Sequence, residues 1–359
     1  MSGESPAQRF FPAPEADGGW YFATSPEEIR QQAGLQPDRL ALAARDLEGR
    51  FGSDSWTICV VRHGILAAEI ISFSGSGISR FDVASVTKSF TSLAFGMLFS
   101  DPQYATTLNL ESKAYDFIPV GHPLNDIKKK DVSVGHLLSM TGGFVGETYG
   151  AFGGETRFGD GIWEYVLGRV PSRRGVDVAR LFADPGTQWE YSDPGYAHLA
   201  LVFAEVTGEE IDTYLNRRLF APIGIPPVSW ARSGGGKLIG PHALSYSGLV
   251  ISARELARCG YLLLCGGMWN GRSIVSQDWI RTATQPSQSF NRRYGYGIWV
   301  NTTGSLWPEL PTDAFAMMGY RGNRCWVVPS LDLVIARVAT GPSELDLRYV
   351  PTLILNAVI

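Results

Sequence analysis

The sequence has little charge and no long hydrophobic run. Charged residues make up only 18% of its 359 residues. The uncharged stretch 89–100 is much shorter than the roughly 20 apolar residues that span a membrane. Residues 1–19 lack a basic segment followed by an apolar one, so we expect no signal peptide. These features predict a cytoplasmic protein without a membrane partner.

Cysteine and histidine are also scarce. The four cysteines are scattered, mostly in apolar runs, which indicates buried free thiols. The five histidines show no metal-ligand spacing. Neither a Gly-x-Ser-x-Gly nucleophile motif nor a glycine-rich phosphate loop occurs. The composition therefore gives no support to metal-dependent or phosphate-binding chemistry.

The balance of charge is close to neutral. A net charge of −4 and a pI near 5.8 give no reason to expect nucleic acid as a partner. The single basic run, at residues 128–130, is flanked by Asp126 and Asp131 and is interpreted as a solvated loop. Hydrophobic residues reach 45% and aromatic residues 12%, which is typical of a well-packed globular protein.

Hydrophobic periodicity predicts strands near both ends of the chain and helices between them. We expect strands at 56–61, 65–71, 294–301, 314–318, 324–328 and 333–339. We expect helices at 26–34, 37–49, 86–100, 133–140, 160–169, 195–207, 209–220, 253–264 and 346–358. This order favours an α+β fold in which a helical region is inserted into one antiparallel sheet.

The same pattern predicts the division into domains. Residues 20–100 and 226–359 are expected to form an α/β domain, with the sheet and the terminal helices. Residues 101–225 are expected to form a helical domain with active-site loops, and residues 1–19 an irregular N-terminal arm. The expected helix 86–100 would begin at the seam between the two domains, where pockets tend to lie.

A serine and a lysine stand one turn apart at the start of that helix. Of the six lysines, only Lys88 has a serine, Ser85, three residues before it. This spacing lets the amine reach the hydroxyl, and a lysine in buried surroundings can accept a proton from serine. The alternative is an N-terminal cap beside a solvated lysine, which is the commoner meaning of an isolated Ser-x-x-Lys.

Two further segments supply candidate partners. Tyr191 is expected on a turn braced by prolines and glycines, where its phenol could shuttle a proton, with a pKa lowered by a nearby lysine. Asp193 could hydrogen-bond the lysine or the substrate. At the end of an expected strand, Gly319 would let a substrate approach the backbone, and the Tyr320 N–H could complete an oxyanion hole. A purely structural role remains open for both segments, through packing of Tyr191 on Trp189 and through a plain strand turn.

Together these pieces resemble the serine β-lactamase and penicillin-binding-protein superfamily, in the class C-like branch that includes esterases and aminohexanoate-dimer hydrolases. Residues 85–88 match its Ser-x-x-Lys motif, residues 191–193 match Tyr-x-Asn with Asp for Asn, and residues 317–319 fall where Lys-Thr-Gly is expected. Residues 132–143, 246–267, 294–300 and 327–337 are similar too. The resemblance spans roughly residues 20–359.

The resemblance implies a β-lactamase-like fold and acyl-enzyme chemistry without a metal or an organic cofactor. Ser85 would attack a carbonyl, and Lys88 and Tyr191 would move the proton. The N–H groups of Ser85 and Tyr320 would hold the oxyanion. Gly319, Asp193 and Arg321 are expected beside the substrate; Tyr149 and Trp163 are added by position only.

Two departures from the family pattern favour a small ester or amide over a β-lactam or a peptidoglycan peptide. Met317 cannot bind a carboxylate as the family's lysine does, and Asp193 adds negative charge near the site. Arg321 or Arg324 could still supply a cation, so a linear amide ending in an acid remains open as a substrate. Acyl transfer, β-lactamase or D-amino peptidase activity, and a non-catalytic binding role remain open as functions. The oligomeric state is open between a monomer and a homodimer.

Overall fold

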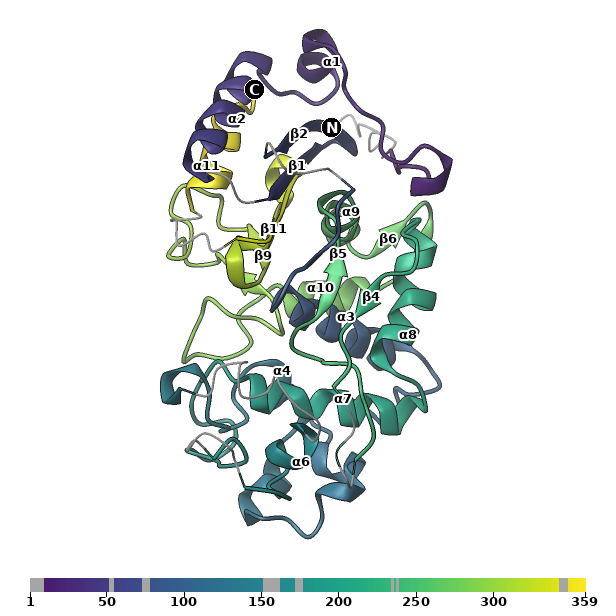
Figure 1. Ribbon diagram of the computed structural model, residues 1–359, viewed down its shortest axis with the longest axis vertical. Helices are drawn as coiled ribbons and strands as arrows, with labels where there is room; N and C mark the ends of the chain where they lie inside the picture. The colour runs from purple at the N-terminus through teal and green to yellow at the C-terminus, as the bar shows by residue number, and fades with distance from the viewer. Residues whose placement is uncertain are drawn as a thin grey trace, which may run out of the picture.

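The computed structural model of this protein describes residues 10–51, 55–72, 78–150, 162–171, 177–233, 236, 239–341 and 348–359. Figure 1 shows an elongated molecule with a layered sheet region at one end and a helical region at the other. The helix α3 (Val86–Ser100) lies between them. The predicted α+β fold is confirmed.

In the described part of the chain the main sheet has six strands, all paired antiparallel, in the order β2-β1-β11-β10-β9-β8. Branched side chains fill its central strands and are buried on both faces, as expected for a sheet covered on both sides. The strands are β1 (Trp56–Arg62), β2 (Ile65–Ile71), β8 (Trp299–Val300), β9 (Phe315–Met318), β10 (Arg324–Val328) and β11 (Leu333–Ala339).

One predicted strand is much shorter than expected. Residues 294–301 form only the two residues of β8, because the chain turns back on itself just before it. Gly297 adopts a φ of 72°, and the Gly295 N–H donates to the Ile298 carbonyl at 2.8 Å. The left-handed conformation that glycine permits here replaces extended backbone.

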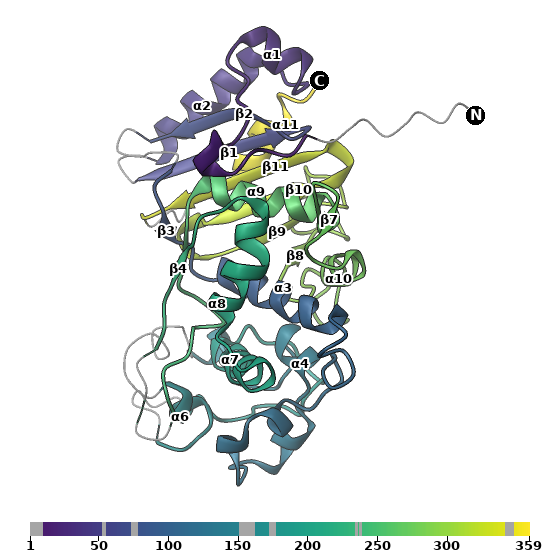
Figure 2. The ribbon, with the colours of Figure 1, turned by 90° about the vertical axis from the view of Figure 1, so that its right-hand side faces the viewer.

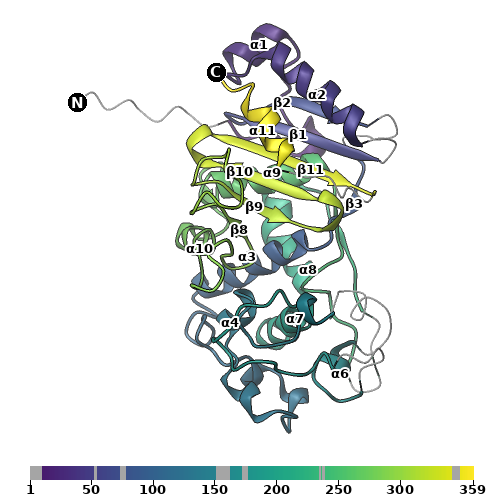
Figure 3. The same ribbon diagram turned by 90° about the vertical axis from the view of Figure 1, so that its left-hand side faces the viewer.

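Helices cover both faces of the sheet. On one face α2 (Pro37–Phe51) packs with α11 (Tyr349–Leu355), and on the other α9 (Ala253–Leu264) packs on β1, β10 and β11, as Figures 2 and 3 show from opposite sides. The short α1 (Pro26–Gln31) begins with the predicted capping box of Ser25. This double cover buries the sheet and leaves its β9 side facing α3.

The helix α3 is buried on all sides. Residues 86–98 are all buried, which fits a helix packed between two layers. Its buried hydroxyl groups donate to carbonyl oxygens of neighbouring loops: Ser89 to Gly297, Thr91 to Ser245 and Ser92 to Tyr296, each at 2.6 Å. These bonds fix α3 against the β8 turn and the segment before β5 (Leu249–Ile251).

The helical region surrounds the far side of α3. Its helices and those near them are α4 (Val134–Leu138), α6 (Ile162–Val166), α7 (Asp193–Thr207), α8 (Ile211–Leu215) with a π-helical extension Asn216–Phe220, and α10 (Gln277–Ala283). The helix α3 packs against α7, α8 and β9, and one hydrophobic core includes residues of both predicted domains. The predicted domain boundaries at residues 100 and 225 therefore stay a prediction.

The interpretation of the basic run as a solvated loop is wrong for its middle residue. Lys129 is completely buried in the 3-10 helix Ile127–Asp131, with its amine 5.6 Å and 5.5 Å from the ring centres of Tyr115 and Phe144. Its amine has no hydrogen-bond partner among the described residues. The tight turn points the middle side chain inward while Lys128 and Lys130 stay exposed.

The cysteines follow the sequence-based expectation. All four cysteines are buried free thiols, as predicted. Among the described residues, no helix combines the length and the apolar character that crossing a membrane requires.

Candidate active site

Ser85 lies at the start of α3, directly after a residue with a strained backbone conformation. β3 (Phe81–Asp82) pairs with β5, and the Val83 N–H donates to the Leu249 carbonyl at 2.9 Å. Ala84 then adopts a φ of 50°, rare for a residue with a Cβ and typical of functional turns. The Ser85 hydroxyl makes no capping bond. Its side chain is therefore available for chemistry.

Lys88 contacts Ser85 as the sequence predicts. Its Nζ lies 2.9 Å from the Ser85 Oγ and also donates to the Tyr246 carbonyl at 3.0 Å. The side chain is almost entirely buried. A lysine so enclosed is held in one position, with its amine directed at the Ser85 hydroxyl.

Asp193 completes the surroundings of this lysine. One of its carboxylate oxygens lies 2.6 Å from the Lys88 Nζ, in an ion pair that lacks the alignment of a hydrogen bond. Asp193 is the first residue of α7, which starts two residues earlier than predicted, and a carboxylate is favourable at a helix N-terminus. Of its two expected contacts, the lysine and the substrate, the structure shows the one with the lysine.

Tyr191 also reaches the nucleophile, but its acidity is opposite to the expectation. Its hydroxyl hydrogen-bonds to Ser85, and its ring centre lies 4.8 Å from the Lys88 amine. Burial, reinforced by the negative charge of Asp193, nevertheless raises the pKa of Tyr191 well above its usual range. The predicted lowering of this pKa is wrong, because burial disfavours the charged phenolate form.

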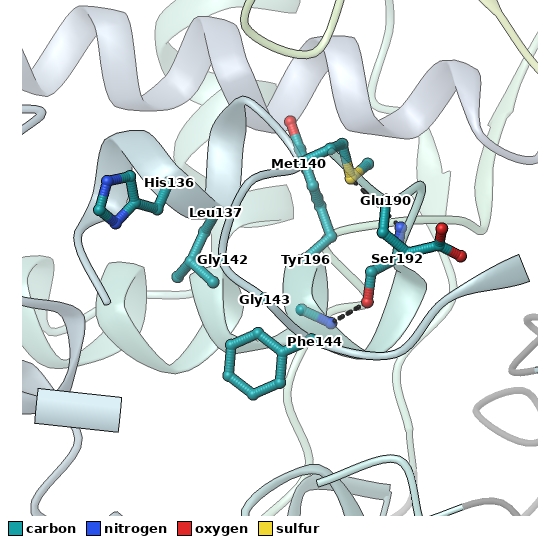
Figure 4. Close-up of a pocket in the computed structure, with 10 residues that line it drawn as sticks. His136, Leu137, Met140, Gly142, Gly143, Phe144, Glu190, Ser192 and Tyr196 are labelled. Carbon is teal, nitrogen blue, oxygen red and sulfur yellow. Dashed lines mark hydrogen bonds between the residues drawn. The ribbon is translucent and has the colours of Figure 1, made fainter. Parts of the chain in front are cut away.

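The turn that carries Tyr191 and Asp193 is fixed by the residue between them. The Ser192 hydroxyl donates to the Val145 carbonyl at 2.7 Å and accepts from the Gly195 N–H at 2.9 Å, which caps α7. Its backbone N–H points at the Met140 sulfur, as Figure 4 shows. A cavity of about 10 Å³ remains beside these contacts, so the packing around the turn is tight.

The predicted oxyanion turn lies against the start of α3. A Cβ placed on Gly319 would collide with the Val83 carbonyl and would stand 3.1 Å from the Ser85 nitrogen. Only glycine therefore allows β9 to come this close. Neither the Ser85 N–H nor the Tyr320 N–H donates to another part of the described chain, so both can serve an oxyanion.

Two arginines hold this turn from behind. Arg324 donates to the carbonyls of Gly319 and Asn323, and Arg337 donates to those of Arg321 and Gly322. Burial lowers the pKa of Arg324 to about 10. Of the two arginines considered for a substrate carboxylate, Arg324 lines the cleft, whereas Arg321 is exposed on the turn with a φ of 60°.

Ser85, Tyr191 and the Gly319 turn border one open cleft with a volume of about 340 Å³. It is lined by Ser85, Glu147, Thr148, Trp189, Tyr191, Trp299, Met318, Gly319, Tyr320 and Arg324. Met318 faces the cleft, whereas Met317, aligned with the family's lysine, is fully buried. The sequence did not indicate that Glu147 and Trp299 line the cleft. Trp189 was considered only as a packing partner of Tyr191, although its place beside the tyrosine motif was a signal that it borders the site.

Two residues proposed by position alone do not line the cleft. Trp163, on α6, is completely buried, and its ring packs 5.7 Å from that of His242. Tyr149 is exposed, and its ring is tilted against that of Phe182 with 4.8 Å between ring centres. Its neighbour Thr148 lines the cleft instead. The structure thus gives no support to substrate contacts by either residue.

Comparison with known proteins gives a consistent result. A family model described as Beta-lactamase matches residues 76–359. A 6-aminohexanoate-dimer hydrolase of Paenarthrobacter ureafaciens is 25% identical over 184 residues, which is 48% of this chain and 44% of that protein. The chain therefore spans less than half the length of that relative.

Solved structures share the fold. A putative 6-aminohexanoate-dimer hydrolase from Bacillus anthracis superposes with a TM-score of 0.67 and 18% identity, covering 97% of this chain and 87% of that one. EstCE1, described as a hydrolase with promiscuous acyltransferase activity, superposes with a TM-score of 0.65 and 16% identity over 89% and 97% of the two chains. At these identities the similarity concerns the fold alone.

Proposed function

Because this chain belongs to the β-lactamase family, within the serine β-lactamase and penicillin-binding-protein superfamily, we propose that it hydrolyses carboxylic esters or small amides through an acyl-enzyme on Ser85. The observation that carries this proposal is the Lys88 Nζ at 2.9 Å from the Ser85 Oγ, in a cleft closed on one side by the Gly319 turn. A nucleophile, a base and two free N–H groups then surround one point.

The first step forms the acyl-enzyme. Lys88 first passes its ammonium proton to the Asp193 carboxylate 2.6 Å away and then takes the proton of Ser85 as Oγ bonds to the carbonyl carbon. The carbonyl oxygen becomes an oxyanion, held by the N–H groups of Ser85 and Tyr320. Ala84 and Gly319 contribute by presenting these two backbone segments at the right distance.

The second step expels the leaving group. Because its raised pKa keeps Tyr191 protonated, this phenol suits the role of proton donor to the departing oxygen or nitrogen. Lys88, whose amine lies 4.8 Å from the centre of the Tyr191 ring, would then return a proton to the phenol. Water then attacks the acyl-enzyme, the acid leaves and Ser85 recovers its proton.

The charge of the site supports a substrate without a carboxylate near the nucleophile. Asp193 replaces the neutral amide of the family motif, and Met318 brings no charge to the cleft. The guanidinium group of Arg324 is engaged by two carbonyl oxygens. As substrates, we therefore favour small neutral or cationic esters and amides over β-lactams and peptidoglycan peptides.

Acyl transfer is the second candidate. The cleft is open to solvent, so an alcohol or an amine could replace water as the acceptor of the acyl group. Hydrolysis of an ester in the presence of added alcohol, with analysis of the products, separates the two. A new ester as the main product would favour the transferase.

The decisive experiment combines a fluorophosphonate probe, p-nitrophenyl butyrate and mapping of the adduct by mass spectrometry. We expect an adduct on Ser85 and turnover of the ester, both lost in Ser85→Ala and strongly reduced in Lys88→Ala. Lys113→Ala, which removes an exposed lysine, is the matched control. Turnover retained by Ser85→Ala, or an adduct on another residue, would contradict the proposal.

A further inference from the structure

A completely buried asparagine lies behind the oxyanion turn and uses both polar atoms of its side chain. The Asn323 Nδ2 donates to the Tyr320 carbonyl at 2.8 Å and to the Asp82 carbonyl at 3.4 Å. Its Oδ1 accepts from the Ala339 N–H at 2.9 Å. These partners fix which atom is the oxygen, because a carbonyl needs a donor and an N–H needs an acceptor. One amide thus connects three segments of the chain.

The bond to Ala339 anchors this amide to the main sheet. β10 begins at Arg324, opposite Arg337 of β11, and the pairing of these two strands ends there. The Asn323 oxygen then serves as the acceptor that the next residues of β11 need on this side. A buried N–H without an acceptor is costly, so this contact gives the Asn323 side chain a fixed place on a rigid support.

The bond to Asp82 reaches the segment that precedes the nucleophile. The Asp82 carboxylate accepts from the Ala84 N–H at 2.8 Å, in the turn where Ala84 has a φ of 50°. A strained conformation of this kind persists only where its surroundings hold it. Because Ser85 follows directly, a contact that restrains the Asp82 backbone also restrains the direction of the Ser85 N–H.

The bond to Tyr320 reaches the other half of the oxyanion site. The Asn323 side chain holds the Tyr320 carbonyl, while the Asn323 carbonyl accepts from the Gly319 N–H at 2.8 Å. Together these bonds close the turn that carries the Tyr320 N–H. The two donors of an oxyanion site must each lie about 2.7–3.1 Å from one oxygen, and a displacement of about 1 Å can slow the reaction about 100-fold.

We propose that Asn323 is a positioning residue that sets the spacing between the N–H groups of Ser85 and Tyr320. It bonds to both backbone segments at once from a fixed point on the sheet. Its side chain is not among the residues that line the cleft, so it acts only through the backbone. This inference rests on the proposed function, because it concerns the oxyanion site of that reaction.

The test separates stabilisation of the oxyanion from binding of the uncharged substrate. Asn323→Ala should lower kcat/KM for p-nitrophenyl butyrate about 10- to 100-fold, because the two donors no longer meet at one point. The affinity for butylboronic acid, whose tetrahedral adduct with Ser85 places an oxygen in the oxyanion site, should fall by the same factor. Inhibition by butyl p-nitrophenyl ether, which has no carbonyl group, should be unchanged.

Asn216→Ala is the matched control. The Asn216 side chain also bridges two segments, through bonds to the N–H and the carbonyl of Val228, but it does not line the cleft. Its loss should lower stability and leave kcat/KM and the boronic acid affinity unchanged. An equal fall of kcat/KM in both variants, or weaker binding of the ether by Asn323→Ala, would show a general structural effect and overturn the inference. So would an unchanged boronic acid affinity in Asn323→Ala.

Asn323→Asp provides a second measurement where the alanine variant does not fold. A carboxylate still accepts from the Ala339 N–H but cannot donate to the carbonyls of Tyr320 and Asp82. We expect a lower kcat/KM than in the wild type at pH 8. Wild-type activity of this variant would overturn the positioning role and leave the proposed hydrolase intact. Folded wild-type protein that shows neither turnover nor labelling of Ser85 by the fluorophosphonate probe would overturn both.

Discussion

The amine of Lys88 and a carboxylate oxygen of Asp193 lie 2.6 Å apart, and the side chains are only 2% and 10% exposed. Each charge is therefore compensated mainly by the other, since little water reaches them. Removing one partner from such a pair leaves an isolated buried charge, which is far more costly than losing an ion pair at the surface.

We expect Asp193→Ala to lower the free energy of unfolding by about 3–5 kcal/mol, because it leaves the Lys88 ammonium without a counter-ion. Asp193→Asn should cost less, since the amide oxygen can still face the amine. Urea denaturation measures both changes. The control is Asp212→Ala, which breaks a more exposed pair with Arg232 and should cost about 1 kcal/mol or less. Equal losses in the two alanine variants would contradict burial as the reason.

A second prediction concerns the close approach of β9 to the nucleophile. Gly319→Ala should reduce kcat about 100-fold or more, because the added Cβ would push the oxyanion turn away from the Ser85 N–H. Gly240→Ala is the control, as a Cβ there meets no atom within 4 Å. Circular dichroism should show that both variants are folded. Full activity of Gly319→Ala would rule out an oxyanion site formed by this turn.

The third prediction follows from the direction of the Tyr191 pKa shift. An acid whose pKa is raised keeps its proton to a higher pH, so loss of the Tyr191 proton should cause no fall in kcat between neutral pH and about pH 10, the usual pKa of tyrosine. A decline centred below that value in the wild type, absent from Tyr191→Phe, would show that the pKa is instead lowered.

The leaving group provides a fourth prediction for the same residue. Tyr191→Phe should slow the hydrolysis of alkyl esters and amides about 10²- to 10⁴-fold, because these leaving groups need a proton. The loss with p-nitrophenyl esters should be much smaller, since p-nitrophenolate departs without one. Rates over a series of leaving groups measure the difference. Equal losses across the series would assign Tyr191 to positioning.

The buried Lys129 gives a prediction about stability and pH. Burial lowers its pKa from 10.5 to about 8, so between these values the unfolded chain binds more protons than the folded protein. The Lys129 contribution to the free energy of unfolding should therefore rise from pH 8 to pH 10.5, by up to about 3 kcal/mol, and give no pH dependence below pH 8.

Lys129→Met should remove this rise and stabilise the protein near pH 7 by about 1–3 kcal/mol, because it fills the same space without a buried charge. Lys128→Met, which removes an exposed amine paired with Asp184, is the matched control. Denaturation curves at several pH values measure both variants. A rise from pH 8 to pH 10.5 that persists in Lys129→Met would point to another group.

Local pattern was sufficient for much of the fold. The apolar periodicity of residues 86–100 predicted α3 with its observed bounds, and short runs rich in apolar and β-branched residues predicted β10 and β11. Such segments are predictable because their secondary structure follows from the local pattern of apolar and β-branched residues. The short length of β8 was not predictable, because the local sequence around Gly297 is equally compatible with a turn and with a strand.

The sequence by itself determined the spacing of Ser85 and Lys88, since three residues along a helix always place two side chains on one face. Only the tertiary structure decided the charges around them. The partner of Lys88, the raised pKa of Tyr191, the choice of Arg324 over Arg321 and the entry of Glu147 into the cleft all depend on chain segments far apart in sequence. Electrostatic effects of this kind vary with distance and burial, which local sequence does not encode.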